Sequence, residues 1–104
     1  MDAKDIMIEG DLKVKITDEV AQGKYSNLAV VAHSTSEFVL DFAKLLPGFN
    51  GGLVHSRVIM APEHCKRLLF ALKDNIDLYE SQYGTIQIPE RTIKPPFGSP
   101  KGEA

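Results

Sequence analysis

The fold is decided by residues 62–84, which read PEHCKRLLFALKDNIDLYESQYG. Pro62 followed by Glu63 is typical of a helix start, and Gly84 is typical of the residue just after a helix end. Apolar side chains recur at helical spacing between them. They form one stripe, called here the helix stripe: Cys65, Leu68, Leu69, Leu72, Ile76, Tyr79 and Tyr83. The spacing predicts one amphipathic helix over residues 62–83.

The sequence upstream of this helix has the apolar alternation of β-strands. Four segments show it: residues 12–16, 25–34, 37–46 and 53–60. Segment 25–34 is apolar on both parities, which is typical of a central strand covered on both faces. Segment 37–46 also fits a helical period through Phe38, Asp41, Phe42 and Leu45, so a helix remains the alternative there. Strand is favoured because the segment is short and rich in Phe.

Together these segments predict an α+β fold. We expect a four-stranded antiparallel β-meander followed by one long C-terminal α-helix packed on one face of the sheet. Residues 12–84 would form the single domain, after an N-terminal segment of residues 1–11. Residues 18–23 read as a turn region. Residues 85–104 hold four of the six prolines and lack apolar periodicity, so we expect a flexible tail.

The composition is that of one soluble globular domain. The chain has 104 residues, of which 43% are hydrophobic and 25% charged, and its net charge is -2. Direct nucleic-acid binding is disfavoured because a chain of net negative charge repels phosphates. No apolar run approaches the length of about 18 residues that crosses a membrane. The single cysteine cannot form an internal disulfide and the first residues lack an apolar signal, so we expect a cytoplasmic protein.

The chemically reactive residues do not form a pattern typical of an enzyme. The candidate metal ligands His33, His55, His64 and Cys65 lack the spacing of a metal site, and Cys65 is expected to be buried on the helix stripe. Glu37 and the carboxylate four residues on lie about 13 Å apart on a strand, which is too far for a catalytic pair. We therefore predict no catalytic residue, no metal and no cofactor.

Two blocks of sequence carry a family resemblance. The first runs from Tyr25-Ser26-Asn27-Leu28 through His33-Ser34 and Glu37-Phe38-Val39-Leu40-Asp41-Phe42 to Leu46-Pro47-Gly48. The second is Ser56-Arg57-Val58-Ile59-Met60-Ala61-Pro62-Glu63-His64, followed by Lys66-Arg67-Leu68-Leu69 and Leu72. Over residues 12–84 the chain resembles the family called domain of unknown function 3467. Ala61 stands where a Thr cap is expected and Cys65 where an Ala is expected.

The resemblance implies a small bacterial or archaeal cytosolic protein without an assigned activity. It also implies an accessory role in transcription, through contact with RNA polymerase. No membrane contact is expected.

One helix can cover only one face of a four-stranded sheet, so the other face needs a partner. We expect that face to carry Ala29, Val31, Val39, Ala43, Leu53 and Ile59. Six residues form the candidate partner-binding site: Glu37, Asp41, His55, Arg57, Val31 and Ile59. The competing interpretation of Asp41 and Arg57 is a cross-strand ion pair, and that of Tyr25-Ser26-Asn27 is a set of hydrogen bonds at a sheet edge.

These observations predict a non-catalytic protein-interaction module that acts as a homodimer or as an accessory subunit of a larger assembly. The alternatives are a small regulatory nucleic-acid-binding protein and an uncharacterised enzyme. Salt-dependent binding of DNA or RNA would favour the first alternative. A concave pocket with converging polar groups would favour the second.

Overall fold

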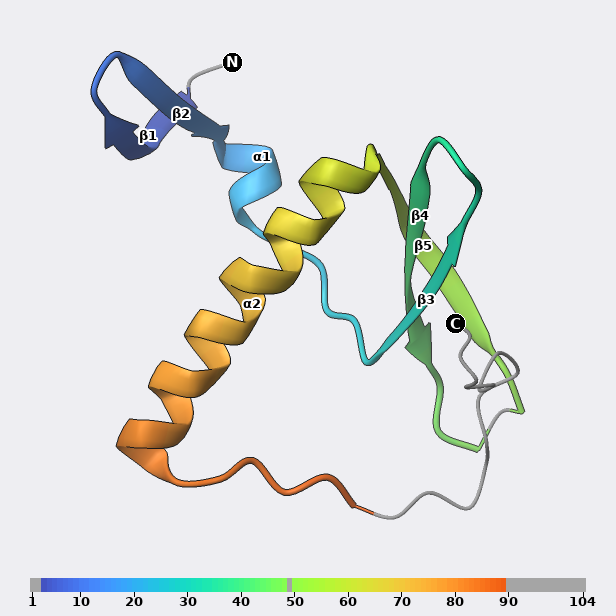
Figure 1. Cartoon of the computed structure of the whole chain (residues 1–104). Helices are drawn as coiled ribbons and strands as arrows, with labels where there is room; N and C mark the ends of the chain where they lie inside the picture. The colour runs from blue at the N-terminus through green and yellow to red at the C-terminus, as the bar shows by residue number, and fades with distance from the viewer. Residues whose placement is uncertain (1–2, 49, 90–104) are drawn as a thin grey trace.

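The computed structural model describes residues 3–48 and 50–89, and it shows an α+β fold in which every strand pair is antiparallel (Figure 1). The elements in chain order are β1 Ala3–Glu9, β2 Leu12–Thr17, α1 Asp18–Ala21, β3 Leu28–His33, β4 Phe38–Leu45, β5 Gly52–Met60 and α2 Pro62–Tyr83. Residues 90–104, on which most of the expected tail falls, lie outside the described residues.

The expected four-stranded meander is wrong, because the described residues form five strands in two separate sheets. The strand expected at residues 12–16 is β2, and it pairs with β1 across the two-residue turn Gly10-Asp11. Gly10 has a φ of 59°, a conformation that suits glycine in a tight hairpin turn. The nearest strand in sequence therefore became the partner of β2, and the hairpin stands apart from the other sheet (Figure 1).

The segment between the two sheets, expected to be a turn, contains the short helix α1. The Thr17 hydroxyl accepts a hydrogen bond from the amide of Val20 at 3.3 Å and so caps the start of α1. Gly23 follows with a φ of 76°, which ends this turn region as its sequence predicts. Residues 24–27 then lead into β3 without regular secondary structure.

The second sheet has the order β3-β4-β5. Strand rather than helix is therefore confirmed for residues 38–45. The expectation that residues 25–34 form the central strand is wrong, since β4 is central and β3 lies at an edge. The only buried side chains of the described residues lie on β4: Leu40 is 8% exposed and Ala43 is 3% exposed. The core is therefore centred on β4.

The strand register defines two faces of this sheet. Phe38, Leu40 and Phe42 point to one side, called here the phenylalanine face. Residues that pair with them on the neighbouring strands lie on the same face, as Val31 does through its pairing with Leu40. The opposite side is called the aspartate face. It carries Val39, Asp41 and Ala43 with their partners on β3 and β5.

The long helix is confirmed with the bounds that the sequence predicts, Pro62–Tyr83. It has Pro62 in its first turn, Ala61 at the N-cap without a side-chain hydrogen bond, and Gly84 at the C-cap with a φ of 93°. The expectation that it packs along one face of the sheet is wrong. None of its residues is buried, and Figure 1 shows α2 leaving the end of β5 and running away from the sheet.

Candidate interaction surface

The helix stripe is a long apolar surface that the described residues leave in contact with solvent. Its members range from half-buried Cys65 to Tyr83, which is 72% exposed. The rings of Tyr79 and Tyr83 contact each other with their centroids 4.9 Å apart. A soluble monomer rarely exposes a continuous apolar surface of this length, so the helix stripe is the first candidate for an interface.

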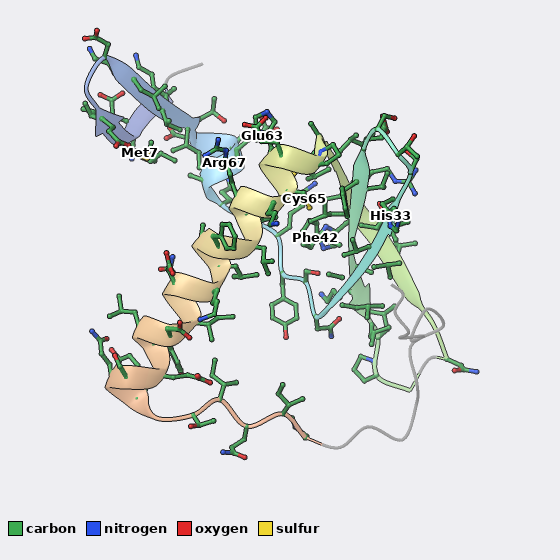
Figure 2. All side chains as sticks on the ribbon, viewed as in Figure 1. Met7, His33, Phe42, Glu63, Cys65 and Arg67 are labelled. Carbon is green, nitrogen blue, oxygen red and sulfur yellow. The ribbon has the colours of Figure 1, made fainter. Side chains whose placement is uncertain are left out.

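Polar pairs stabilise the flanks of the same helix. Arg67 Nη2 donates to Glu63 Oε2 at 3.0 Å, and Lys73 Nζ donates to Asp77 Oδ2 at 2.7 Å. Glu63 and Arg67 lie together on the first turns of α2 (Figure 2). The hydrogen bond from Lys73 to Asp77 raises the pKa of Lys73 above its ordinary value. Because both pairs span one helical turn, they stabilise α2 itself and leave the stripe apolar.

An apolar groove lies where α2 meets the sheet. Its volume is about 350 Å³, and it is lined by Phe38, Pro62, Cys65, Lys66 and Leu69. In Figure 2, Cys65 and Phe42 are labelled between α2 and the sheet. Cys65 was expected to be buried and is only half-buried, because no described residue covers the groove on its open side. The groove joins the helix stripe to the phenylalanine face.

Two of the predicted partner-binding residues form an ion pair with each other. Arg57 Nε donates to Asp41 Oδ1 at 2.7 Å, and its Nη2 donates to Asp41 Oδ2 at 2.8 Å. The residues are direct cross-strand neighbours on β4 and β5, on the aspartate face. The guanidinium holds the pKa of Asp41 below its ordinary value. The competing interpretation of this pair as a cross-strand ion pair is therefore confirmed.

The alternation along residues 53–60 predicts that His55 and Arg57 share a face, and this prediction is wrong. The register of β4 with β5 shifts between Phe42 and Ala43, which leaves His55 in a β-bulge. Its Nδ1 lies 3.1 Å from the hydroxyl of Ser56, which pairs with Phe42. Its Nε2 lies 3.0 Å from the backbone oxygen of Tyr25. The bulge therefore turns His55 toward the phenylalanine face.

Val31 and Ile59 were expected on one face, and the register places them on opposite faces. Val31 pairs with Leu40 on the phenylalanine face, and Ile59 pairs with Val39 on the aspartate face. Both side chains are more than half exposed. The six candidate residues therefore do not form one continuous patch.

The remaining candidate, Glu37, belongs to the turn between β3 and β4. Its amide donates to Ser34 Oγ at 3.3 Å, and its carbonyl accepts from the Ser34 amide at 2.9 Å. The exposed Glu37 side chain precedes β4 and has no place in its register. The structure therefore does not bring Glu37 together with Asp41.

The Tyr25-Ser26-Asn27 motif closes the other end of the β3–β4 pair. The Ser26 hydroxyl shares its single proton between the carbonyl oxygens of Leu28 and Ala43, which each lie 3.0 Å from Oγ. Asn27 Oδ1 accepts from the Leu45 amide at 2.7 Å, and the Asn27 amide donates to the Ala43 carbonyl at 3.1 Å. These bonds confirm the interpretation of the motif as a hydrogen-bond set at the sheet edge.

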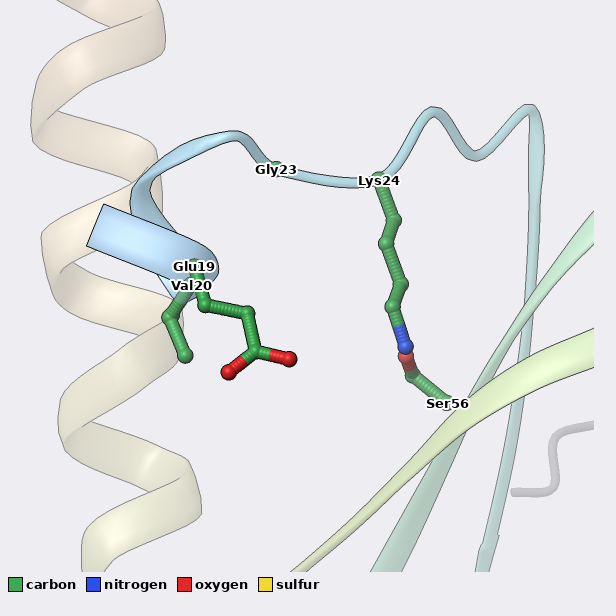
Figure 3. A pocket seen from close by; sticks show the side chains of 5 residues that line it. All are labelled: Glu19, Val20, Gly23, Lys24 and Ser56. Carbon is green, nitrogen blue, oxygen red and sulfur yellow. The ribbon is translucent and has the colours of Figure 1, made fainter. Parts of the chain in front are cut away.

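A second cavity, of about 470 Å³, lies between the α1 region and β5. Glu19, Val20, Gly23, Lys24 and Ser56 line it (Figure 3). In Figure 3 the side chain of Lys24, on the segment between α1 and β3, extends toward Ser56 on β5. The lining combines one acid, one base and one hydroxyl, and none of these five residues belongs to the six candidates.

Residues 3–48 and 50–89 hold no group of three or more His, Cys, Asp and Glu side chains that could bind a metal ion. Within the same residues, no helix is both long enough and apolar enough to cross a membrane.

Sequence reasoning missed the helix stripe as a site because an apolar helix face normally becomes the core of its own domain. No signal within the helix itself distinguishes a face that packs inside the chain from one that packs against another chain.

The comparison with known families agrees with the resemblance seen in the sequence. A family model described as protein of unknown function (DUF3467) matches residues 2–88, so the match includes the β1–β2 hairpin as well as the sheet and α2. No curated protein and no solved structure matches the chain. The match spans most of the chain, and the chain therefore belongs to the DUF3467 family of proteins of unknown function.

Proposed function

We propose that this chain is a non-catalytic protein-interaction module that acts as a homodimer or as an accessory subunit of a larger assembly. One observation carries the proposal: α2 is a 22-residue amphipathic helix without a single buried residue. Most helix stability in proteins comes from packing of the apolar face rather than from the intrinsic preference of the residues for the helix. The apolar face of α2 therefore needs a surface from another chain.

The size of the molecule supports this proposal. Its accessible surface is 9035 Å², whereas a folded monomer of 11.5 kDa exposes about 5800 Å². Its radius of gyration is 16.6 Å, compared with about 13 Å for a compact domain of this length. Both values exceed those of a compact domain, so the chain leaves accessible more surface than a compact domain of its length would.

The experiment compares two leucines of α2 that differ only in the side of the helix they occupy. Leu72 lies in the helix stripe and is 54% exposed, while Leu78 lies outside the stripe and is 57% exposed. We expect the purified wild-type chain to be a dimer or larger by light scattering. We expect Leu72→Glu to dissociate it, because a carboxylate in an apolar interface loses its hydration.

Leu78→Glu is the matched control and should keep the wild-type mass. A wild-type monomer whose Leu72→Glu variant unfolds at the same temperature would contradict the homodimer. Association with RNA polymerase stays a prediction from the family resemblance, and co-purification from native cells tests it.

A further inference from the structure

The helix stripe contains a regular seam. Six of its members are spaced by alternating intervals of four and three residues: Cys65, Leu69, Leu72, Ile76, Tyr79 and Tyr83. An alternation of four and three is the a/d repeat of a coiled coil, in which two helices pack side chains into each other at an angle of about 20°. Leu68 borders the seam. This spacing suits the packing of α2 against another helix.

We propose that the partner helix is α2 of a second copy of this chain, laid antiparallel, with the partner's Tyr79 and Tyr83 seated in the apolar groove. This inference rests on the proposed function, and it names the partner that binds the helix stripe. The arguments are the matching of residue sizes along the seam, the charges beside it, and the position of the groove.

Residue sizes match in one antiparallel register. That register uses all six seam residues: Cys65 faces the partner's Tyr83, Leu69 faces the partner's Tyr79, and Leu72 faces the partner's Ile76. The two-fold symmetry of the pair repeats each contact. Each tyrosine thus faces a smaller side chain of the partner, either Cys65 or Leu69. The two branched aliphatic residues, Leu72 and Ile76, meet at the centre of the interface. A parallel pair would instead place Tyr83 against the partner's Tyr83.

The charges beside the seam favour the same register. Lys66, Lys73 and Glu80 occupy one flank of the seam. Antiparallel helices bring this flank against its own copy, so that Lys66 lies beside the partner's Glu80 at both ends of the interface. The two Lys73 side chains meet near the symmetry axis, where each is already paired with Asp77 at 2.7 Å. A parallel pair would place Lys73 beside the partner's Leu68 and Glu80 beside the partner's Asn75, without an ion pair.

The apolar groove lies where this register needs it. Cys65 and Leu69 line the groove, and they are the residues that face the two partner tyrosines. Phe38 supplies the opposite wall from the sheet. The tyrosine rings already contact each other in the free chain, so they can enter as one unit. The groove at the start of α2 and the aromatic pair at its end are thus complementary parts of one interface.

Cysteine cross-linking tests this register, and the native Cys65 serves as one half of the cross-link. In the variant Tyr83→Cys, Cys65 should form a disulfide with the partner's residue 83 under mild oxidation, giving a covalent dimer on a non-reducing gel. A short bismaleimide is the second probe, because it tolerates a wider gap between the sulfurs. Ser81→Cys, on the opposite side of the same helix, is the matched control and should stay monomeric on the gel.

Each result separates the register from the proposed function. Wild-type chain linked through Cys65 alone would show a parallel pair and overturn the antiparallel register, while leaving the homodimer intact. A dimer by light scattering in which Tyr83→Cys gives no more cross-link than Ser81→Cys would overturn the register in the same way. A wild-type monomer in solution would overturn the register and the homodimer together, and would leave the accessory subunit as the remaining form of the proposed function.

A charge exchange gives a test that does not depend on cysteine chemistry. Lys66→Glu places two carboxylates together at each end of the interface and should raise the dimer dissociation constant roughly tenfold. The double variant Lys66→Glu/Glu80→Lys should recover the wild-type value. Glu80 also accepts a hydrogen bond from the amide of Ile86 at 2.9 Å, so circular dichroism of Glu80→Lys reports any loss of helix separately. Failure of the double variant to recover, with normal helix content, would overturn the register.

Discussion

At the scale of single residues, the sequence predicts the ion pair of Asp41 with Arg57 but not the place of His55. Opposite charges on two consecutive strands are interpreted as a pair because consecutive strands are neighbours in a meander. The side on which His55 lies depends on a one-residue shift between β4 and β5, which alternation along β5 alone cannot reveal. For the same reason, the faces on which Val31 and Ile59 lie can be assigned only from the pairing of the strands.

Asp41→Asn should destabilise the fold at neutral pH and lose its effect in acid. A carboxyl group whose pKa is lower in the folded state stabilises the fold above its unfolded pKa. That contribution disappears as the pH falls through the folded pKa, which for Asp41 lies below the ordinary 3.8. The melting temperature of Asp41→Asn should therefore be lower than that of the wild type at pH 7. The difference between the two should begin to narrow at about pH 4 and should disappear below the folded pKa of Asp41.

Thermal melts monitored by circular dichroism between pH 7 and pH 2 measure this difference. Asp11→Asn, in the β1–β2 turn, removes a carboxylate elsewhere and should melt as the wild type does at pH 7. A difference for Asp41→Asn that stays constant down to pH 2 would show that lost packing, rather than the ion pair, causes it.

At the scale of elements, the sequence predicts the helix and the strands around β4, whereas the hairpin was missed. Pro62, Gly84 and the helix stripe define α2 in the sequence, and the structure keeps those bounds. The missed strand β1 had a signal: a glycine followed by one residue between two short apolar segments is typical of a two-residue hairpin turn. Gly10-Asp11 is that signal, and the polar composition of residues 1–11 obscured it.

Ala61→Thr should stabilise α2. Ala61 occupies the N-cap with extended backbone angles, φ -64° and ψ 153°, and offers no side-chain acceptor to the first amides of the helix. A threonine hydroxyl can accept from one of these amides, which raises the free energy of unfolding by about 1 kcal/mol. Urea unfolding followed by circular dichroism measures the gain.

Ala61→Val is the matched control, because valine has the shape of threonine without its oxygen. An equal gain in the free energy of unfolding from valine would show that packing against neighbouring side chains, and not the hydroxyl, causes the effect. No gain from threonine would show that the first turn of α2 does not limit stability.

At the scale of the whole molecule, the two sheets and α2 cover little of one another, and this could not be read from the sequence. The apolar pattern predicts which side chains seek burial, but not whether the surface that buries them belongs to the same chain. Val20 in α1 and Leu53 in β5 are also more than half exposed, so exposure is a property of the whole chain and extends beyond α2. An assembly larger than a dimer would find further apolar surface there.

The melting temperature should depend on protein concentration. When folding and association are coupled, each tenfold rise in concentration adds about 1.4 kcal/mol to the stability of the dimer. For a dimer of this size the melting temperature should then rise by roughly 3–5 °C per tenfold step. Calorimetry over a hundredfold range of concentration measures the slope.

Leu72→Glu should melt at a temperature that does not change with concentration, and Leu78→Glu should keep the wild-type slope. A flat wild-type profile would show that the chain folds without a partner.

The unburied state of α2 has a consequence for the amount of this protein in a cell. A helix whose order comes from a second chain frays when copies are scarce, and frayed helices are cut by proteases. If a second copy orders α2, newly made chains are degraded until their concentration exceeds the dissociation constant, after which assembled chains persist. The level of the protein then responds to its synthesis rate as a threshold, and the solvent-facing apolar helix sets where that threshold lies.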